Sequence, residues 1–127
     1  MAGLVLGGPV PTEIKLHQTS KMMDLVFDDG FSCSLSYEFL RVMTPSAEAR
    51  GHGPGQGTLQ VGKRNVAIDR VDVVGNYAIR PVFDDGHDSG IYSWDLLYRF
   101  GRDQESLWSK YLEQLTVAGL SRDAVSK

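Results

Sequence analysis

The chain has 127 residues, of which 42% are hydrophobic, and its 13 basic and 16 acidic side chains give a formal net charge of −3. This length and apolar share predict one domain with its own hydrophobic core. The acidic balance argues against nonspecific binding to nucleic acid or to an anionic membrane, because both need a basic surface. No run of about 18 apolar residues is present, so no membrane span is expected. Cys33 is the only cysteine, which excludes an intrachain disulfide and fits a cytoplasmic protein.

The first part of the chain predicts a three-stranded meander. Residues 1–11 are rich in glycine and proline and lack the features of a signal peptide, so we expect a disordered tail. Apolar and polar residues alternate over 12–18 and recur over 22–27, which is typical of two paired strands. Asp28-Asp29-Gly30 then predicts a type I′ turn into a third strand over 31–35.

A short helix and a long irregular stretch follow. Ser36 is the candidate N-cap of a helix over 37–42, which ends before Pro45. The irregular stretch over 44–62 contains the run 50–57, whose four glycines exclude regular structure and expose backbone N–H groups, as in anion-binding loops. It lacks the Lys-Ser/Thr ending of a phosphate-binding loop. The candidate binding residues of this loop are Arg50, His52 and Gln56.

Two further strands are indicated by β-branched residues. The alternation over 65–74 slips at Asp69-Arg70, which predicts a bulge. The strand over 77–83 contains Pro81, which has no N–H to donate. This strand therefore lies at a sheet edge, or Pro81 turns its nitrogen away from the ladder.

The last part of the chain predicts helices. Asp84-Asp85-Gly86 predicts another turn, and residues 87–91 form a short strand at most. Ser93 is the candidate N-cap of a helix that Gly101 is expected to end. The apolar spacing over 104–117 predicts a separate amphipathic helix.

One unit occurs twice in the sequence: it consists of a strand, an Asp-Asp-Gly turn, a short strand and a capped helix. The repeat reflects either a packing device used twice or a pseudo-twofold pair with both turns at one rim. The predicted class is α+β, with a mainly antiparallel twisted sheet built from β-hairpins, one short helix and a C-terminal amphipathic helix. We expect a single domain over 12–119 and a disordered tail over 120–127.

Three runs carry a family resemblance. They are Leu40-Arg41 with Pro45, the run 74–79 with Gly-Asn-Tyr-Ala, and the run 85–94 with Asp-Gly-His-x-x-Gly-Ile-Tyr-Ser-Trp. On these motifs, over about residues 12–100, the chain resembles the gamma-butyrobetaine hydroxylase-like N-terminal domain family, whose stand-alone bacterial members are domains of unknown function. In the hydroxylases this domain precedes an iron- and 2-oxoglutarate-dependent catalytic domain. The 127 residues leave no room for that domain, so we expect neither its activity nor its cofactors.

The resemblance also implies a structural zinc site made of three cysteines and one histidine. In this chain the cysteine positions fall on Thr44, Ser46 and Ala49, and the histidine position falls on His87. Protonated hydroxyls bind zinc poorly and alanine has no ligand atom, so we expect the site to be lost.

Two hypotheses of function follow. The sequence contains no visible nucleophile–base pair, so we expect a protein that is not an enzyme. The first hypothesis is a non-catalytic binding or adaptor domain for an unknown protein partner, with Asp85, His87 and the glycine-rich loop as its rim. The alternative is a metal-binding protein in which His52 approaches His87, with Asp84, Asp85 or Asp88 completing a zinc or iron site. By analogy with related domains, such a protein would support metal or iron–sulfur metabolism.

Overall fold

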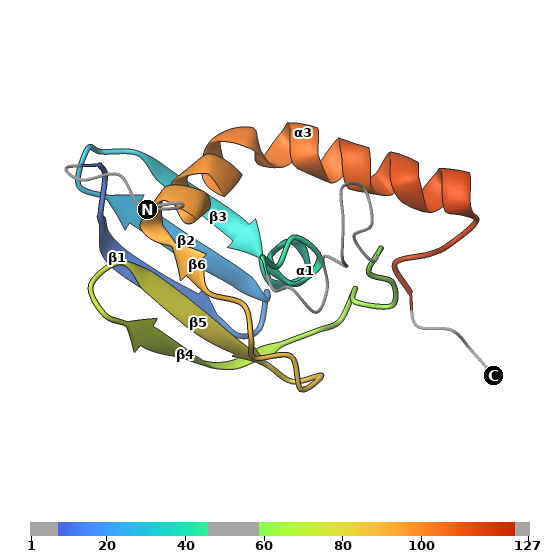
Figure 1. Cartoon of the computed structure of the whole chain (residues 1–127), viewed down its shortest axis with the longest axis horizontal. Coiled ribbons are helices and arrows are strands. Elements are labelled where there is room, and N and C mark those ends of the chain that lie inside the picture. Colours follow the sequence, from blue (N-terminus) through green and yellow to red (C-terminus); the bar gives the residue numbers. More distant parts are fainter. Residues whose placement is uncertain (1–7, 46–58, 124–127) are drawn as a thin grey trace.

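The computed structural model describes residues 8–45 and 59–123. Strands β1 (Pro11–His17), β2 (Met22–Phe27) and β3 (Ser32–Ser36) form an antiparallel sheet in that order, followed by helix α1 (Tyr37–Val42). Strands β4 (Ile68–Val74), β5 (Ala78–Phe83) and β6 (Tyr92–Ser93) form a second antiparallel sheet, followed by helix α3 (Trp94–Ala118). Figure 1 shows this arrangement, which confirms the predicted α+β class.

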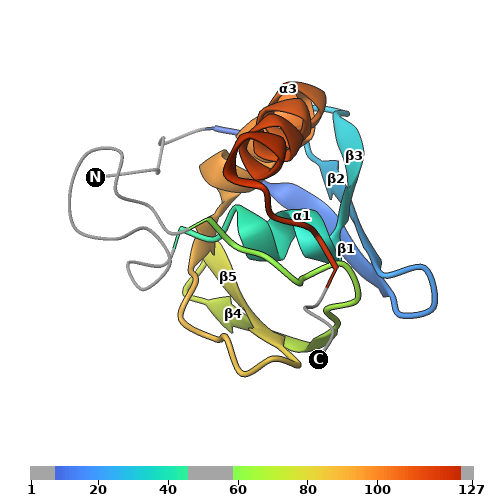
Figure 2. The same cartoon turned by 90° about the vertical axis from the view of Figure 1, so that its right-hand side faces the viewer.

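Both sheets and both helices contribute to one hydrophobic core. Figure 2 shows α1 between the two sheets, with α3 running over the top. The side chains with the lowest exposure come from all four parts: Leu25, Leu35, Tyr37, Leu40, Ile79, Tyr92 and Leu97. No helix in the described ranges is both long and apolar enough to cross a membrane.

The two Asp-Asp-Gly turns have the same backbone geometry. Gly30 N donates to Phe27 O at 3.0 Å, and Gly86 N donates to Phe83 O at 3.1 Å. The φ angles of these glycines are +94° and +90°, whereas the preceding aspartates have negative φ. A type I′ turn needs positive φ at both central residues, so that prediction is wrong. Each turn is a type I turn followed by a glycine in the left-handed region.

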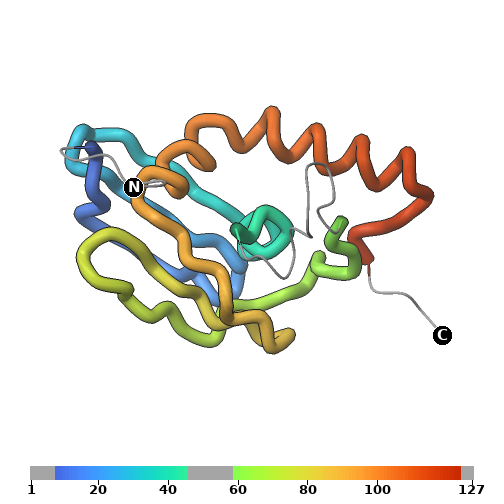
Figure 3. Tube along the Cα trace, in the orientation of Figure 1, coloured from blue at the N-terminus to red at the C-terminus, as the bar shows by residue number. Residues whose placement is uncertain are grey.

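The repeat seen in the sequence is a β-β-β-α unit. Ser36 accepts a hydrogen bond from Phe39 N at 3.0 Å, and Ser93 accepts one from Leu96 N at 3.1 Å, so both predicted N-caps are confirmed. The two Asp-Asp-Gly turns, however, lie at opposite ends of the molecule (Figure 3). The idea that both turns share one rim is therefore wrong.

The second sheet contains both irregularities that the sequence indicated. A register shift lies between Ile68 and Arg70, which confirms the predicted bulge. Pro81 lies in the middle strand, β5, but β6 pairs only with Ala78 and Ile79 and does not extend to Pro81. Its nitrogen points to the side of β5 on which the described part of the chain provides no ladder partner. The expected short strand over 87–91 is instead the two-residue strand β6.

Helix α3 does not end at Gly101: it runs without a break from Trp94 to Ala118, a length of 25 residues. A Cβ atom at position 101 would lie 2.5 Å from Cys33 Sγ and 3.0 Å from Phe31 Cε2. The glycine is thus required for the close crossing of α3 over β3. The predicted helix break is wrong because tertiary packing outweighs the cost of about 1 kcal/mol for glycine in a helix.

We predict that Gly101→Ala lowers the free energy of unfolding by about 2 kcal/mol, because the clash with Cys33 exceeds the gain in helix propensity. Chemical denaturation measures this change. The matched control is Ser109→Ala, at an exposed position of the same helix, which we expect to be neutral or slightly stabilising. Equal or greater stability of Gly101→Ala would contradict the close crossing.

The segment after α3 folds back onto α1. Arg122 makes two hydrogen bonds to the carboxylate of Glu38, at 2.8 and 2.6 Å, and its guanidinium lies 5.1 Å from the centre of the Trp108 ring. Arg64 N donates to Arg122 O at 3.1 Å. Figure 3 shows this segment beside residues 60–64. The sequence contained no signal for these contacts. The predicted tails over 1–11 and 120–127 stay predictions for the residues outside the described ranges.

We predict that Arg122→Ala lowers the free energy of unfolding by about 2 kcal/mol, because it leaves the carboxylate of Glu38, only 6% exposed, without its counter-charge. Thermal or chemical unfolding measures the loss. Arg64→Ala provides the control, since the Arg64–Asp123 pair is solvent-exposed and worth about 0.5 kcal/mol. Similar effects of the two substitutions would show that the Glu38 contact has no special weight.

Candidate functional site

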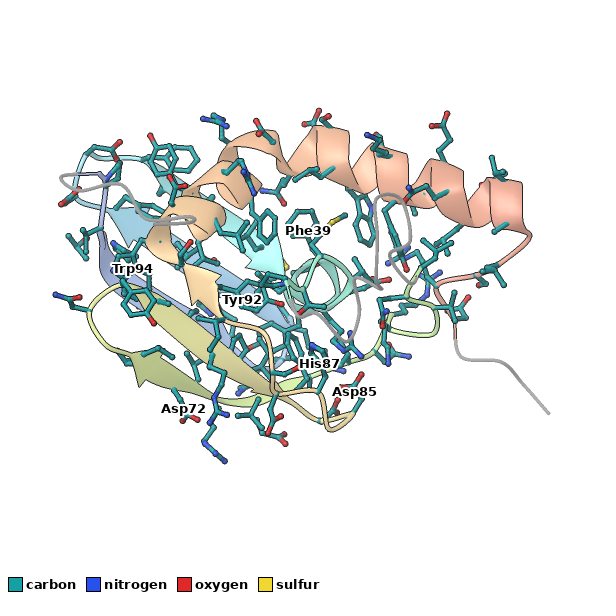
Figure 4. All side chains as sticks on the ribbon, viewed as in Figure 1. Phe39, Asp72, Asp85, His87, Tyr92 and Trp94 are labelled. Carbon is teal, nitrogen blue, oxygen red and sulfur yellow. The ribbon has the colours of Figure 1, made fainter. Side chains whose placement is uncertain are left out.

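The end of α1 meets the loop that follows β5, and this junction contains residues that the sequence singled out. Thr44, two residues beyond α1, is 5% exposed. Its Oγ1 lies 3.0 Å from Nε2 of His87, which is a hydrogen-bond distance. Figure 4 shows Asp85 and His87 side by side on the loop. Two positions 43 residues apart in the chain are thus in direct contact.

The absence of a side chain at Gly90 allows this contact. A Cβ atom at position 90 would lie 2.5 Å from Thr44 Oγ1 and 3.1 Å from Tyr92 Cε1. The Tyr92 hydroxyl donates to Leu40 O at the end of α1. Burial raises the pKa of Tyr92 well above its usual range, although hydrogen bonding to Thr44 opposes the shift. The tyrosine is therefore a neutral donor that holds α1 against the loop.

Asp85 joins three segments through charge. Its Oδ2 is 2.9 Å from Arg41 Nε and 2.6 Å from Lys63 Nζ, and its Oδ1 accepts from His87 N at 3.1 Å. Partial burial alone would raise the pKa of Asp85. The hydrogen bonds from Lys63 and His87 N and the charge of Arg41 outweigh burial and lower the pKa to about 2. Asp85 is therefore ionised and fully engaged at neutral pH.

The same cluster extends to α3. Arg41 Nη1 donates to Gln60 Oε1 at 3.1 Å, and Tyr111 OH donates to Gln60 O at 2.6 Å. The Arg41 side chain is only 9% exposed, so Asp85 supplies the counter-charge of a nearly buried cation, and Gln60 accepts a further hydrogen bond from it. We call the set Arg41, Thr44, Gln60, Lys63, Asp85 and His87 the junction cluster.

Two hollows lie near the described elements. One, of about 240 Å³, borders the junction cluster and is lined by residues 62–66 with Asp84 and Asp85. The other, of about 450 Å³, lies between α3 and the first sheet, and Phe39 and Trp108 line its apolar part. Lys63 and Asp85 in the first hollow are paired with each other, so they are not aimed at an empty space.

The structure brings together some of the predicted site residues. Asp85 and His87 lie in the junction cluster, and Thr44 does as well. The remaining predicted positions lie outside the described residues: Ser46, Ala49, Arg50, His52 and Gln56. Sequence reasoning missed Arg41, Gln60 and Lys63 as members of the cluster. Arg41 stood in the Leu-Arg part of the family motif, but only the fold shows that its partner is Asp85.

The donor set of the junction cluster does not fit a zinc site. Thr44 offers a hydroxyl where a thiolate would be needed, and Asp85 is bound by two cations. Within residues 8–45 and 59–123, no three His, Cys, Asp or Glu side chains are grouped closely enough to hold a metal ion.

Cys33 and Ser34 do not have the environment of activated nucleophiles. Burial and the charge of Asp24 raise the pKa of Cys33 to about 11, so the thiol stays protonated at neutral pH. Ser34 Oγ donates to Asp24 at 2.5 Å, and His17 Nε2 lies 2.8 Å from the other oxygen of the same carboxylate. The carboxylate thus stands between serine and histidine, whereas an activated serine needs the histidine as its own neighbour.

The fold and the junction define a small α+β domain in which a loop histidine packs against the end of a short helix. The family model described as gamma-butyrobetaine hydroxylase-like, N-terminal, matches residues 14–98, and the chain belongs to this family. A comparison with curated proteins finds no match.

Solved structures support the same assignment. Two proteins solved by NMR in solution are 45% and 44% identical to this chain, with TM-scores of 0.81 and 0.78. Each alignment covers 95% of this chain, and 95% and 93% of the respective relatives. A protein of unknown function of the DUF971 family from Acidithiobacillus ferrooxidans ATCC 23270, in a crystal structure at 1.93 Å, is 34% identical. It has a TM-score of 0.61 over 72% of this chain and 91% of its own.

We predict that Asp85→Asn lowers the free energy of unfolding at pH 7 by about 2 kcal/mol, because it leaves the nearly buried Arg41 without its counter-charge. Asp88→Asn, at an exposed position of the same loop, is the matched control and should change stability by less than about 0.5 kcal/mol.

The effect depends on pH in a defined direction. The folded-state pKa of Asp85, about 2, lies below the value of about 3.9 for an unfolded chain. The stabilisation is therefore complete above about pH 5 and is lost as the pH falls from there towards 2. The stability difference between wild type and Asp85→Asn should shrink over this window, and a difference that stays constant would contradict the assigned role.

Proposed function

We propose that this chain is a non-catalytic binding or adaptor domain that has lost the zinc site of its family. The observation that carries the proposal is the direct contact of 3.0 Å between Thr44 and His87, two positions that the family resemblance implies as metal ligands. A zinc ion between two ligand atoms holds them about 3.3–3.8 Å apart, as ligand bonds of about 2.0–2.3 Å at tetrahedral angles require. The hydrogen bond supplies the link without a metal.

The charges of the junction cluster support a structural role rather than a chemical one. A general acid or base works best when its pKa lies near the working pH and when it can reach a substrate proton. Asp85 has a pKa of about 2 and is bound by Arg41, Lys63 and the backbone of His87. The low pKa of Asp85 and its contacts therefore both favour a structural role, in which Asp85 holds these segments together.

The alternative function is a metal-binding protein for zinc or iron. It is favoured by the presence of His87 beside Thr44 and Asp85, since an imidazole and a carboxylate are common ligands of both metals. In that case the remaining ligands would come from residues outside the described ranges. A cytoplasmic location and a supporting role near metal metabolism remain proposals for either function.

Metal analysis of the untagged protein, combined with a proton–nitrogen NMR titration by zinc and by ferrous iron, tests the proposal. We expect no bound metal, and no selective shift at His87 near one equivalent of either ion. His87→Ala is the control for unspecific surface binding, which should be the same in both proteins. Stoichiometric zinc or iron that His87→Ala abolishes would overturn the proposal in favour of the alternative.

A further inference from the structure

Strand β4 presents an open edge with exposed apolar surface. Among the described strands, β4 pairs only with β5, and it lies at the margin of the molecule in Figure 1. The side chain of Val73 is 71% exposed on this strand. No large apolar side chain of β1, the outer strand of the first sheet, is among the exposed ones. An exposed apolar edge is a template for pairing with another strand.

The register shows which backbone groups face outwards. Phe83 N, at the end of β5, donates to His87 O, and Tyr77 O, just before β5, accepts from Trp94 N. The odd-numbered residues of β5 therefore turn their backbone groups away from β4. The even-numbered residues of β5 therefore bond to their partners in β4, which are also even-numbered. The N–H and C=O groups of Val71 and Val73 consequently point to the open edge.

The charges on β4 are self-complementary. Arg70 and Asp72 flank Val71 and share one face of the sheet, where Asp72 is 3.1 Å from Arg70 Nε and 2.7 Å from Arg80 Nη2. Figure 4 shows Asp72 at the margin of the molecule. If a second β4 pairs antiparallel about Val71, Arg70 of each copy stands opposite Asp72 of the other. Opposite charges at such cross-strand positions favour the pair.

We propose that β4 is a self-association edge, at which two copies of this chain pair antiparallel about Val71 with twofold symmetry. The charges also select the register, because a pair centred on Asp72 would place like charges directly opposite each other. The bulge between Ile68 and Arg70 limits the regular ladder about Val71 to residues 70–72 of each copy. So short an interface produces a weak dimer, populated at high protein concentration. Self-association at β4 is independent of the junction cluster, and either proposal can hold without the other.

Sedimentation velocity with charge variants tests this interface. We expect wild type to shift from monomer towards dimer between about 10 µM and 1 mM, which spans weak affinities. Arg70→Asp alone and Asp72→Arg alone place like charges opposite each other and should each weaken dimerisation about tenfold or more. An equal mixture of these two variants restores both opposite-charge pairs and should associate again. Lys15→Asp, on β1, is the matched control and should behave as wild type.

Three results would overturn the proposal. They are a wild-type protein that stays monomeric up to 1 mM, single variants that associate as wild type does, and a mixture that associates no better than its components. NMR spectra recorded over the same concentrations provide a second readout, in which shifts should concentrate at residues 69–74. Because the mixture contains the same two variants, its recovery cannot be explained by their folding.

Discussion

The carboxylate of Asp85 connects parts of the molecule that no β-ladder joins. In the described ranges the two sheets have separate hydrogen-bond ladders, so their relative position depends on side chains. The apolar core supplies most of the contact area, but apolar contacts are not directional. The ion pairs from Asp85 to Arg41 and Lys63, together with the Thr44–His87 contact, fix the end of α1 against the loop after β5. Directional, charge-assisted bonds of this kind define one arrangement among many that could bury similar area.

On the proposed loss of the family zinc site, hydrogen bonds and ion pairs join the junction in place of metal–ligand bonds. A zinc ion joins its ligands by strong, directional bonds that contribute to folding outright. Here a hydroxyl and an imidazole lie within hydrogen-bond distance of each other, with Gly90 making room for the approach. A single hydrogen bond contributes only about 1 kcal/mol, so the neighbouring ion pairs of Asp85 carry much of the stabilisation. This distribution of the stabilisation agrees with the proposed binding or adaptor role, in which the junction cluster stabilises the fold and does not itself bind the partner.

The two β-β-β-α units use the same local signals but differ in how their helices pack. Helix α1 has six residues and lies between the sheets, whereas α3 has 25 residues and crosses the first sheet. The crossing depends on Gly101, which lets α3 approach β3 at Cys33. The helix of the second unit thus covers the sheet of the first, and Arg122 then ties the end of α3 back to Glu38 on α1. The two units therefore depend on contacts with each other.

The sequence alone determined the local elements of this protein. Alternating residues predicted the strands, Ser36 and Ser93 marked the helix starts, and the slipped phase at Asp69-Arg70 indicated the bulge, because each of these depends on neighbouring residues. Only the tertiary structure decided that α3 continues through Gly101, that Asp85 meets Arg41 and Lys63, and that Thr44 reaches His87. These outcomes depend on contacts between residues 22 to 68 positions apart, and sequence periodicity has no information at that range. Family motifs named His87 and Thr44 as related positions, but the distance between them had to come from the fold.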